Sequence, residues 1–167
     1  MSNLSSKIEQ AAHYCAEHEM CHEVAVLIDL AVSSRRVRLR VVNLAQGSVL
    51  MECLVASGRG RSLKTRLWPQ TGDVPDSWLT PVGRCKVAER YEGSFGVSYR
   101  LDGLDSTNSN VRSRAIVLHP SEEVPERNYS LLPLWCSRGC VVVSPQSMKQ
   151  LDEILSAHKD VLLWIYN

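Results

Sequence analysis

The sequence holds a cysteine and a histidine in settings that suit acyl transfer through a thiol. Cys140 follows Ser137-Arg138-Gly139 and precedes three valines, and His119 ends an apolar run upstream. A thiolate is a strong nucleophile, and an imidazole can take its proton and later return one, so the pair predicts a cysteine acyltransferase. The alternative is a structural cysteine, because most cysteines are small buried apolar residues.

The residues around the cysteine suit the same chemistry. Gly139 leaves room for a substrate carbonyl, and the N–H groups of Gly139 and Cys140 could form an oxyanion hole. We expect Ser137 to help shape the site. Arg138 cannot act as a base because its guanidinium stays protonated, but it could hold a substrate carboxylate or lower the pKa of the thiol. His119 is then the base that the sequence offers.

Short strands are the elements expected to carry these groups. Period-two alternation and short apolar runs predict strands over residues 24–28, 37–41, 49–56, 82–91, 97–101, 114–119, 141–143 and 161–166. In the second of these, apolar residues alternate with three arginines that we place on the solvent face, namely Arg36, Arg38 and Arg40.

Two helices are also expected. Residues 3–22 have apolar residues at helical spacing and should pack on the outside of the domain. Ser144-Pro145 is typical of a helix start, because serine is a good N-cap and proline suits the first helical position. Many strands and few helices predict a mostly β protein. We divide it into an N-terminal amphipathic helix, residues 1–23, and a catalytic domain, residues 24–167.

The motifs of the chain, in order and spacing, resemble those of the murein L,D-transpeptidase catalytic domain family (YkuD-like). Ser137-x-Gly139-Cys140 after an upstream strand-end histidine is similar to that family's signature. Further segments resemble its "TPxG", "YxG…G…LRLxGLE" and "N…N…RAIVxH" stretches; these are Thr80-Pro81-Val82-Gly83, then Tyr91-Glu92-Gly93 with Gly96 and residues 99–105, and then Asn108, Asn110 and residues 114–119.

The resemblance implies a β-sandwich with an N-terminal helix and a short helix after the catalytic cysteine. It implies a bacterial enzyme in which Cys140 attacks the carbonyl of a diamino acid in a peptidoglycan tetrapeptide stem and D-alanine leaves. An amine from a neighbouring stem would then resolve the thioester as a 3-3 cross-link, whereas water would make the enzyme an L,D-carboxypeptidase. No metal and no organic cofactor is implied, and a carbapenem should acylate the cysteine.

Four residues are candidates for binding the stem peptide. Tyr99 belongs to one of the resembling motifs, and Arg138 precedes the nucleophile. Arg59 and Arg61 belong to a basic loop that we expect over residues 58–76, and arginine binds carboxylates in a bidentate manner. The alternative is a solvated loop. Trp68 is the aromatic residue near these cations, so we do not expect a nucleic-acid site, which would need more aromatic interleaving.

Departures from the family's pattern alter the rim of the site. Pro120 follows the histidine where glycine is usual, Trp135-Cys136 stand in place of Gly-Arg, and Ser57-Gly58 in place of His-Gly. Of these, Pro120 and Trp135-Cys136 favour a rival interpretation, a non-catalytic peptidoglycan-binding module on the same fold. Cys136 is either a core residue or a redox partner that forms a reversible disulfide with Cys140.

Composition and charge limit the partners and the cellular location that we expect for the protein. A formal net charge of +1 gives no strong attraction to nucleic acid, and no apolar run approaches the roughly 20 residues that span a bilayer. The N-terminus shows no signal peptide. The sequence was therefore written without its leader, or the protein is made in the cytoplasm and leaves by another route, or it works inside the cell. If it is exported, we expect it in the periplasm or cell envelope, and a cell-wall-targeting toxin is a third interpretation. The oligomeric state stays open. The six cysteines have no framework spacing, and we expect them to be mostly reduced.

Histidines and cysteines also gather near the N-terminus, at His13, Cys15, His18, Cys21 and His22. Thiol and imidazole groups are good zinc ligands, but the helix face that carries them also carries the apolar residues of the predicted helix. Packing is the interpretation that we adopt, and a zinc site is the alternative.

Overall fold

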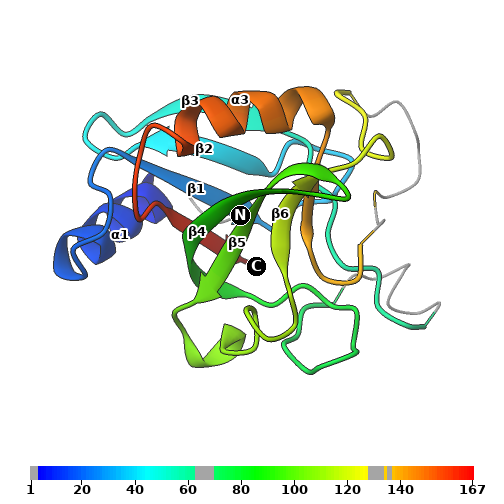
Figure 1. Ribbon diagram of the computed structural model, residues 1–167. Coiled ribbons are helices and arrows are strands. Elements are labelled where there is room, and N and C mark those ends of the chain that lie inside the picture. Colours follow the sequence, from blue (N-terminus) through cyan, green and yellow to red (C-terminus); the bar gives the residue numbers. More distant parts are fainter. Residues whose placement is uncertain (1–3, 63–69, 128–133, 135–136) are drawn as a thin grey trace.

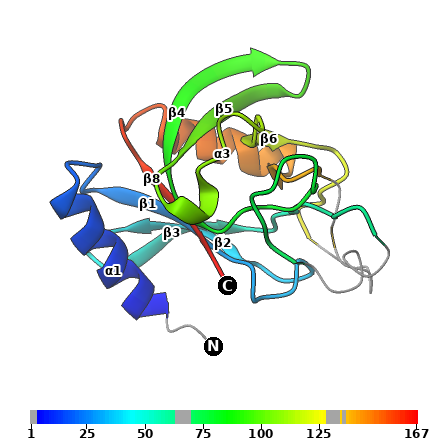
Figure 2. The same ribbon diagram turned by 90° about the horizontal axis from the view of Figure 1, so that it is seen from below.

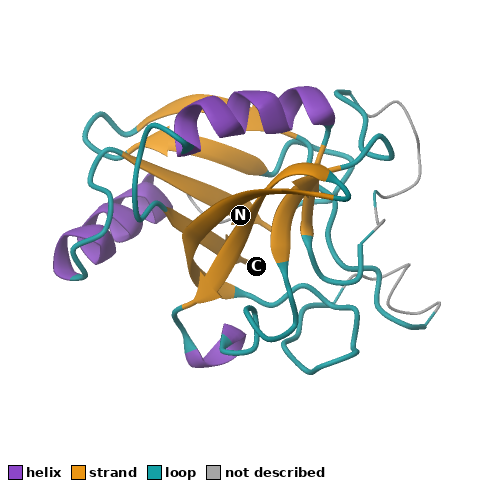
Figure 3. Ribbon diagram, in the orientation of Figure 1, coloured by secondary structure: helices purple, strands orange, loops and turns teal. Residues whose placement is uncertain are grey.

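The computed structural model describes residues 4–62, 70–127, 134 and 137–167. Within these ranges the chain forms two α-helices, a short 3-10 helix and eight strands (Figures 1 and 3). In chain order they are α1 (Leu4–Glu17), β1 (Val24–Asp29), β2 (Leu39–Asn43), β3 (Ser48–Cys53), β4 (Gly83–Gly93), β5 (Gly96–Gly103), η1 (Ser106–Asn108), β6 (Val117–Pro120), β7 (Val141–Val143), α3 (Pro145–Leu155) and β8 (Leu162–Tyr166).

The described strands form one mixed sheet in the order β3-β2-β1-β8-β4-β5-β6-β7. β1 runs parallel to β8, β6 runs parallel to β7, and the other neighbours are antiparallel. The two ends of the sheet meet after β3, where Ala56 N donates to Val142 O (2.8 Å) and Val142 N donates to Ala56 O (3.1 Å). The sheet therefore curls around a core, and the expected mostly β architecture is confirmed.

One apolar core lies inside the curled sheet and takes side chains from every described strand. α3 lies alongside the sheet (Figure 1) and buries Met148, Leu151 and Leu155 in this core. The Ser144 hydroxyl accepts a hydrogen bond from Ser147 N at 3.1 Å, so the predicted start of this helix is confirmed. β7 and α3 together give the residue that precedes them, Cys140, a rigid support.

α1 packs against the outer face of the sheet, apart from that core (Figure 2). It ends at Glu17, earlier than the predicted residue 22. Glu19 adopts a left-handed φ of 53°, and Met20 N donates to Cys15 O at 3.1 Å, which is a Schellman-type helix ending. The α1 side chains buried beneath the helix are Ile8, Ala11 and Cys15.

Arg38 is buried, which corrects the expectation that it lies on the solvent face of its strand. β2 begins one residue later, at Leu39, and only 2% of Arg38 is exposed. Its Nε donates to Val55 O at 3.0 Å and its Nη2 donates to Ser57 Oγ at 3.0 Å. Burial lowers the pKa of Arg38 to about 10, an effect opposed by the nearby carboxylate of Asp29. The guanidinium thereby ties β2 to the segment that leads toward the nucleophile loop.

The first half of the strand predicted before His119 is a turn in the structure. β6 spans Val117–Pro120, whereas the expected strand covered residues 114–119. Ala115 has a left-handed φ of 51°, and its N–H donates to Arg112 O at 3.1 Å. This turn sends the Arg114 side chain against residues 72–79.

Candidate active site

Cys140 ends a tight loop that Gly139 makes possible. Gly139 has φ +123°, a conformation that residues with a side chain rarely adopt. A Cβ at this position would lie 2.6 Å from Ile116 Cδ1 and 2.8 Å from Leu79 O, so no larger residue fits. The chain is therefore tightly packed at Gly139, directly before Cys140 and β7. Cys140 lines a cavity of about 510 Å³.

Ser137 stabilises this loop from within. Its hydroxyl donates to Cys140 O at 2.8 Å and accepts from Gly139 N at 3.1 Å. Ser137 therefore holds the backbone of the loop that ends at Cys140. The second contact engages the Gly139 N–H, which the sequence analysis assigned to the oxyanion hole. Of the expected pair of donors, the Cys140 N–H is the one that Ser137 does not use.

The Thr80 hydroxyl fastens the loop to a second segment. Thr80 Oγ1 accepts from Gly58 N at 2.7 Å and donates to Gly139 O at 2.9 Å, and the residue is only 2% exposed. Gly58 has no room for a side chain, because a Cβ there would collide with Trp78 O. Three segments that are distant in the sequence therefore meet at one hydroxyl.

His119 lines the cavity from β6 and is only 6% exposed. Its Nδ1 lies 2.9 Å from Pro120 O. Because a carbonyl can only accept a hydrogen bond, this contact puts the proton on Nδ1 and leaves Nε2 as an acceptor in the neutral ring. A general base needs that tautomer.

The register of β6 and β7 brings His119 and Cys140 to the same face of the sheet. His119 pairs with Val142 in the parallel ladder, and Cys140 lies two residues before Val142. From strand spacing and rise, this diagonal separates the two Cα atoms by roughly 8 Å, so the side chains can approach each other. At rest the thiol donates to Ala115 O at 3.7 Å, and no hydrogen bond joins Sγ to the described imidazole.

Burial favours the neutral forms of Cys140 and His119. Burial raises the pKa of the Cys140 thiol above its ordinary 9.0, although a hydrogen bond from the Val117 backbone and the positive charge of Arg114 both act to lower it. Burial also lowers the pKa of His119 below 6.5, although the hydrogen bond with the Pro120 backbone acts to raise it. Both shifts favour a thiol and a neutral imidazole near neutral pH, and from that state the imidazole must take the thiol proton during attack.

The core cysteines are poorly suited to react. Burial raises the pKa of Cys15 to about 11 and the pKa values of Cys53 and Cys85 to about 12. A buried thiol with so high a pKa stays protonated and inert. Among the described cysteines, Cys140 is the one that lines the cavity with His119.

Arg114 lies behind the nucleophile loop, and the sequence analysis did not single it out. Only 6% of its side chain is exposed. Nη1 donates to Gly72 O at 3.0 Å and pairs with Asp73 at 3.2 Å, and Nη2 donates to Leu79 O at 2.7 Å. The guanidinium favours the thiolate form of Cys140. Its place in a resembling motif was the signal available in the sequence.

Phe95 is a second residue that the sequence analysis missed. It lies in the two-residue tip of the β4–β5 hairpin, where Gly93 pairs with Gly96. Its ring stacks on the His119 imidazole, with centroids 4.3 Å apart, and the residue lines the cavity while remaining 58% exposed. No sequence pattern indicates this contact, because the curvature of the hairpin decides where its tip lies.

Trp78 gathers three of the candidate substrate-binding residues. The guanidinium carbons of Arg138, Arg59 and Arg61 lie 4.7, 4.9 and 5.0 Å from the centroid of its ring. Arg138 lines both the cavity at Cys140 and an adjacent cavity of about 460 Å³. The structure therefore brings the three arginines together, on a tryptophan that the sequence analysis passed over.

The sequence matches the L,D-transpeptidase catalytic domain family over residues 1–166. The chain belongs to this family. The match includes α1 as well as the sheet. No curated protein matches the chain in sequence.

Solved structures with the same fold as this chain include L,D-transpeptidases and a cell shape determining protein. The enzyme of Xylanimonas cellulosilytica (residues 123–326) has a TM-score of 0.52 and 19% identity, covering 86% of this chain and 60% of that chain. The Enterococcus faecium catalytic domain has a TM-score of 0.51 and 17% identity, with 87% and 98% covered. The helical cell shape determining protein Pgp2 of Campylobacter jejuni has a TM-score of 0.55 and 12% identity, with 87% and 48% covered. The chain spans 60%, 50% and 59% of the first three such structures.

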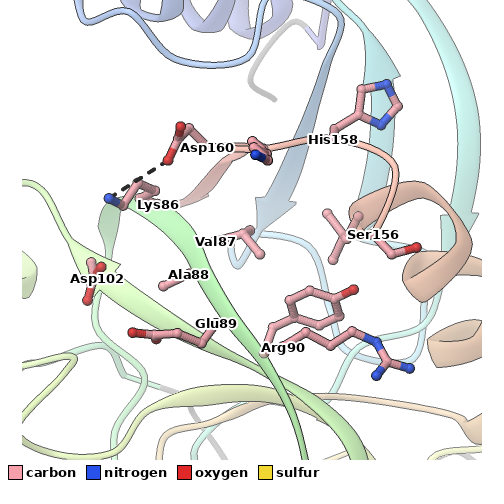
Figure 4. Close-up of a pocket in the computed structure, with 12 residues that line it drawn as sticks. Lys86, Val87, Ala88, Glu89, Arg90, Asp102, Ser156, His158 and Asp160 are labelled. Carbon is pink, nitrogen blue, oxygen red and sulfur yellow. Dashed lines mark ion pairs between the residues drawn. The ribbon is translucent and has the colours of Figure 1, made fainter.

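Tyr99, although it lies in a motif that resembles the family's, is not brought to the nucleophile. It pairs with Leu118, one residue before His119, so the Tyr99 and His119 side chains point to opposite faces of the sheet. The Tyr99 hydroxyl donates to Asp152 Oδ1 at 2.7 Å, and both burial and this contact raise the pKa of the phenol. Tyr99 lines a separate cavity of about 490 Å³. Figure 4 shows this cavity beside β4, with Lys86 and Arg90 from that strand and Ser156, the residue after α3.

Other sequence predictions lie outside this site. Cys136 and Trp135 fall outside the described residues, so the redox partnership stays a prediction. Near the N-terminus, Cys15 is buried under α1, whereas His18 is exposed and stacks on Tyr14. Among the described residues, no group of three or more His, Cys, Asp or Glu side chains could hold a metal ion. In the same part of the chain, no helix has the length and apolarity to cross a membrane.

Proposed function

We propose that this protein is a peptidoglycan L,D-transpeptidase that transfers an acyl group through a thioester on Cys140. The observation that carries the proposal is the placement of Cys140 and His119 in one cavity, with the His119 tautomer that can accept the thiol proton. Membership of the L,D-transpeptidase catalytic domain family supports the same class of reaction. The substrate is a tetrapeptide stem that ends in D-alanine, and the protein acts in the periplasm or cell envelope, where that polymer lies.

In the first half-reaction the Cys140 thiol gives its proton to His119 Nε2, and Sγ attacks the carbonyl carbon that precedes D-alanine. The Cys140 N–H donates to the developing oxyanion. The C–N bond then breaks, His119 returns the proton to the leaving amine, and D-alanine departs. The product is a thioester between Cys140 and the shortened stem.

In the second half-reaction an amine of a neighbouring stem attacks the thioester carbonyl. His119 takes a proton from that amine and gives it to the sulfur as the C–S bond breaks, which forms the 3-3 cross-link and restores the thiol. Water in place of the amine gives the L,D-carboxypeptidase reaction. A neutral resting pair suits this cycle, because His119 begins and ends each half-reaction without the extra proton.

Residues that touch neither reacting atom hold these two in place. Ser137 and Thr80 fix the nucleophile loop through Gly139. Arg114 supports the same loop from below, and its charge opposes the rise in the pKa of the thiol that burial causes. These are positioning roles.

Intact-mass spectrometry with a synthetic tetrapeptide stem tests the proposal. The wild type is expected to gain the mass of the stem without its D-alanine, and Cys140→Ala is expected to gain nothing. Cys21→Ala is the matched control, a partly buried cysteine outside the cavity, and should behave as the wild type. His119→Ala should slow acylation by about 10²- to 10⁴-fold, the usual contribution of a positioned base.

Product analysis separates transfer from hydrolysis. With an acceptor stem present, a cross-linked dimer indicates transpeptidation, whereas a shortened stem alone indicates carboxypeptidase activity. A carbapenem should also add to the wild type and not to Cys140→Ala. A folded protein that takes up neither stem nor carbapenem, and whose Cys140 resists iodoacetamide, would overturn the proposal in favour of a non-catalytic peptidoglycan-binding module.

A further inference from the structure

The β4–β5 hairpin carries Phe95 to His119 although its outer part has no third strand beside it. β8 pairs with β4 over residues 83–86, and β6 pairs with β5 at residues 99–100. Among the described strands, residues 91–98 therefore pair only with each other, and Figure 2 shows the hairpin standing out from the rest of the sheet. A two-stranded hairpin is marginally stable by itself, so contacts of its side chains must decide where its tip lies.

A bulge in β4 puts an arginine at the base of this outer part. Val87 pairs with Leu101 and Arg90 pairs with Tyr99, so β4 advances by three residues while β5 advances by two. Because side chains alternate between the two faces of a strand, the extra residue brings Arg90 to the core-facing side, next to Tyr99. In a regular ladder Glu89 would take that place.

The helix α3 presents Asp152 to this pair of side chains. The Asp152 carboxylate accepts from Arg90 Nε at 2.7 Å, from Arg90 Nη2 at 2.9 Å and from the Tyr99 hydroxyl at 2.7 Å. The contact with Arg90 lowers the pKa of Asp152 below 3.8, so the carboxylate stays charged near neutral pH. A bidentate pair of this kind fixes direction as well as distance. Leu151, beside Asp152 in the chain, is fully buried, so the carboxylate is held on an anchored helix.

This contact lies between the anchored part of the hairpin and its tip. From the pair formed by Arg90 and Tyr99, three further pairs lead to the tip, roughly 10 Å away at the usual rise of a strand. Within the outer part, Val97 packs against the main core, whereas Phe95 is 58% exposed. Little apolar burial therefore holds the tip, and a small rotation at its base displaces the ring that stacks on His119.

We infer that Asp152 is a positioning residue for His119. Its carboxylate fixes the hairpin on α3 through Arg90 and Tyr99, and the hairpin in turn keeps Phe95 on the imidazole. No residue of α3 lines the cavity of the nucleophile, so the helix acts on the site through the hairpin. The consequence for acylation rests on the proposed function, which makes His119 the base. The position of the ring on the imidazole does not depend on that function.

NMR titration of the His119 ring tests the inference without a substrate. In Asp152→Ala the hairpin is released and water reaches the imidazole, so the pKa should rise toward 6.5 by at least about half of the rise in Phe95→Ala. Loss of a negative charge would by itself lower this pKa, so a rise reports the displaced ring. Arg90→Lys keeps the charge without the bidentate contact, and it should give a smaller rise.

Glu89→Gln is the matched control for these variants. Glu89 lies next to Arg90 and also forms a bidentate pair, at 2.7 and 2.8 Å, but its partner is Arg112 rather than a residue of α3. This substitution should leave the His119 titration unchanged. If Asp152→Ala folds, as its circular dichroism reports, and titrates at His119 like the wild type, the inference is wrong.

A double variant shows whether Asp152 acts through the ring. In a Phe95→Ala background, Asp152→Ala should add no further rise to the pKa of His119, because the ring that it positions is already absent. Groups that act through one another give such non-additive effects. A rise equal to the sum of the two single variants would show that Asp152 affects His119 by another route, which contradicts the inference.

Intact mass with the tetrapeptide stem measures the consequence for the reaction. Asp152→Ala should acylate about two- to tenfold more slowly than the wild type near neutral pH, the scale of one aromatic pair, and Glu89→Gln should acylate normally. If the wild type takes up no stem, the proposed function fails, and the NMR titrations still decide the inference. A normal rate in an Asp152→Ala protein whose His119 pKa has risen would refute the positioning role in the reaction.

Discussion

The ring of Phe95 lies on the imidazole of His119, with centroids 4.3 Å apart and planes inclined by 24°. Phe95 comes from the tip of the β4–β5 hairpin, and His119 comes from β6, which lies next to β5 in the sheet. The hairpin therefore covers a side chain of the neighbouring strand. Burial is the main cause that lowers the pKa of His119. The hairpin tip therefore sets the hydration of the proposed base.

Removal of this ring should raise the pKa of His119. In Phe95→Ala, water reaches the imidazole and the charged form is penalised less, so the pKa moves up toward 6.5. Acylation near neutral pH should slow by about two- to tenfold, the scale of one aromatic pair. NMR titration of the His119 ring measures the shift. Val74→Ala, a change at an exposed apolar residue outside the cavity, is the control and should alter neither quantity.

The labelling of Cys140 by iodoacetamide should keep rising with pH beyond 9.0. Only the thiolate reacts, and burial holds the pKa of the Cys140 thiol above 9.0, so the rate should increase by about tenfold per pH unit below the pKa. His119→Ala should leave this slope unchanged, because the imidazole is already neutral over that range. Peptide mapping after limited labelling measures the rate. A plateau near neutral pH would instead indicate a resting thiolate–imidazolium pair.

A methyl group at residue 139 should abolish acylation. Gly139→Ala combines φ +123° with a Cβ 2.6 Å from Ile116 Cδ1, and we expect a loss of about 2–4 kcal/mol in the free energy of unfolding. Gly47→Ala is the matched control, because Gly47 also has positive φ (+65°), but a Cβ there would meet no atom within 4 Å. It should lose only about 1 kcal/mol and acylate normally. Urea unfolding and intact mass measure the two effects, and normal acylation by Gly139→Ala contradicts the role given to this loop.

Loss of the Thr80 hydroxyl should loosen the nucleophile loop. Thr80→Val leaves the Gly58 N–H and the Gly139 carbonyl without their partner in a buried place, which should lower the free energy of unfolding by about 2–4 kcal/mol. Acylation should slow as well, and Thr80→Ser should restore much of both. Thr107→Val, at an exposed threonine, should change stability by less than about 0.5 kcal/mol. If Thr80→Val unfolds and acylates like Thr107→Val, the hydroxyl does not organise the site.

Local patterns in the sequence predicted much of the fold. Ser144-Pro145 indicated the start of α3, and the alternating segments indicated most strands, because neighbours in the chain dominate caps and strand periodicity. The boundary before His119 was wrong. The turn at Ala115 depends on the contacts of Arg114 with residues 72–79, which lie far away in the sequence.

Alternation failed at Arg38 for a related reason. Its position in the pattern favoured the solvent face, but the curled sheet brings Val55 O and the Ser57 hydroxyl to the guanidinium. A long side chain with such acceptors can be buried at a place where periodicity predicts exposure. Tyr99 illustrates the converse, because its motif suggested the site and its strand register turns it toward Asp152.

The sequence by itself determined which chemical groups are available: a thiol after a glycine, an imidazole at a strand end, and arginines near both. The tertiary structure alone decided their environment, namely the ring of Phe95 on His119, the tryptophan at the centre of the arginines, and the neutral state of the thiol and imidazole. The physical reason is that hydration and electrostatic interactions depend on distance in space. The curled sheet makes neighbours of residues that the chain keeps far apart.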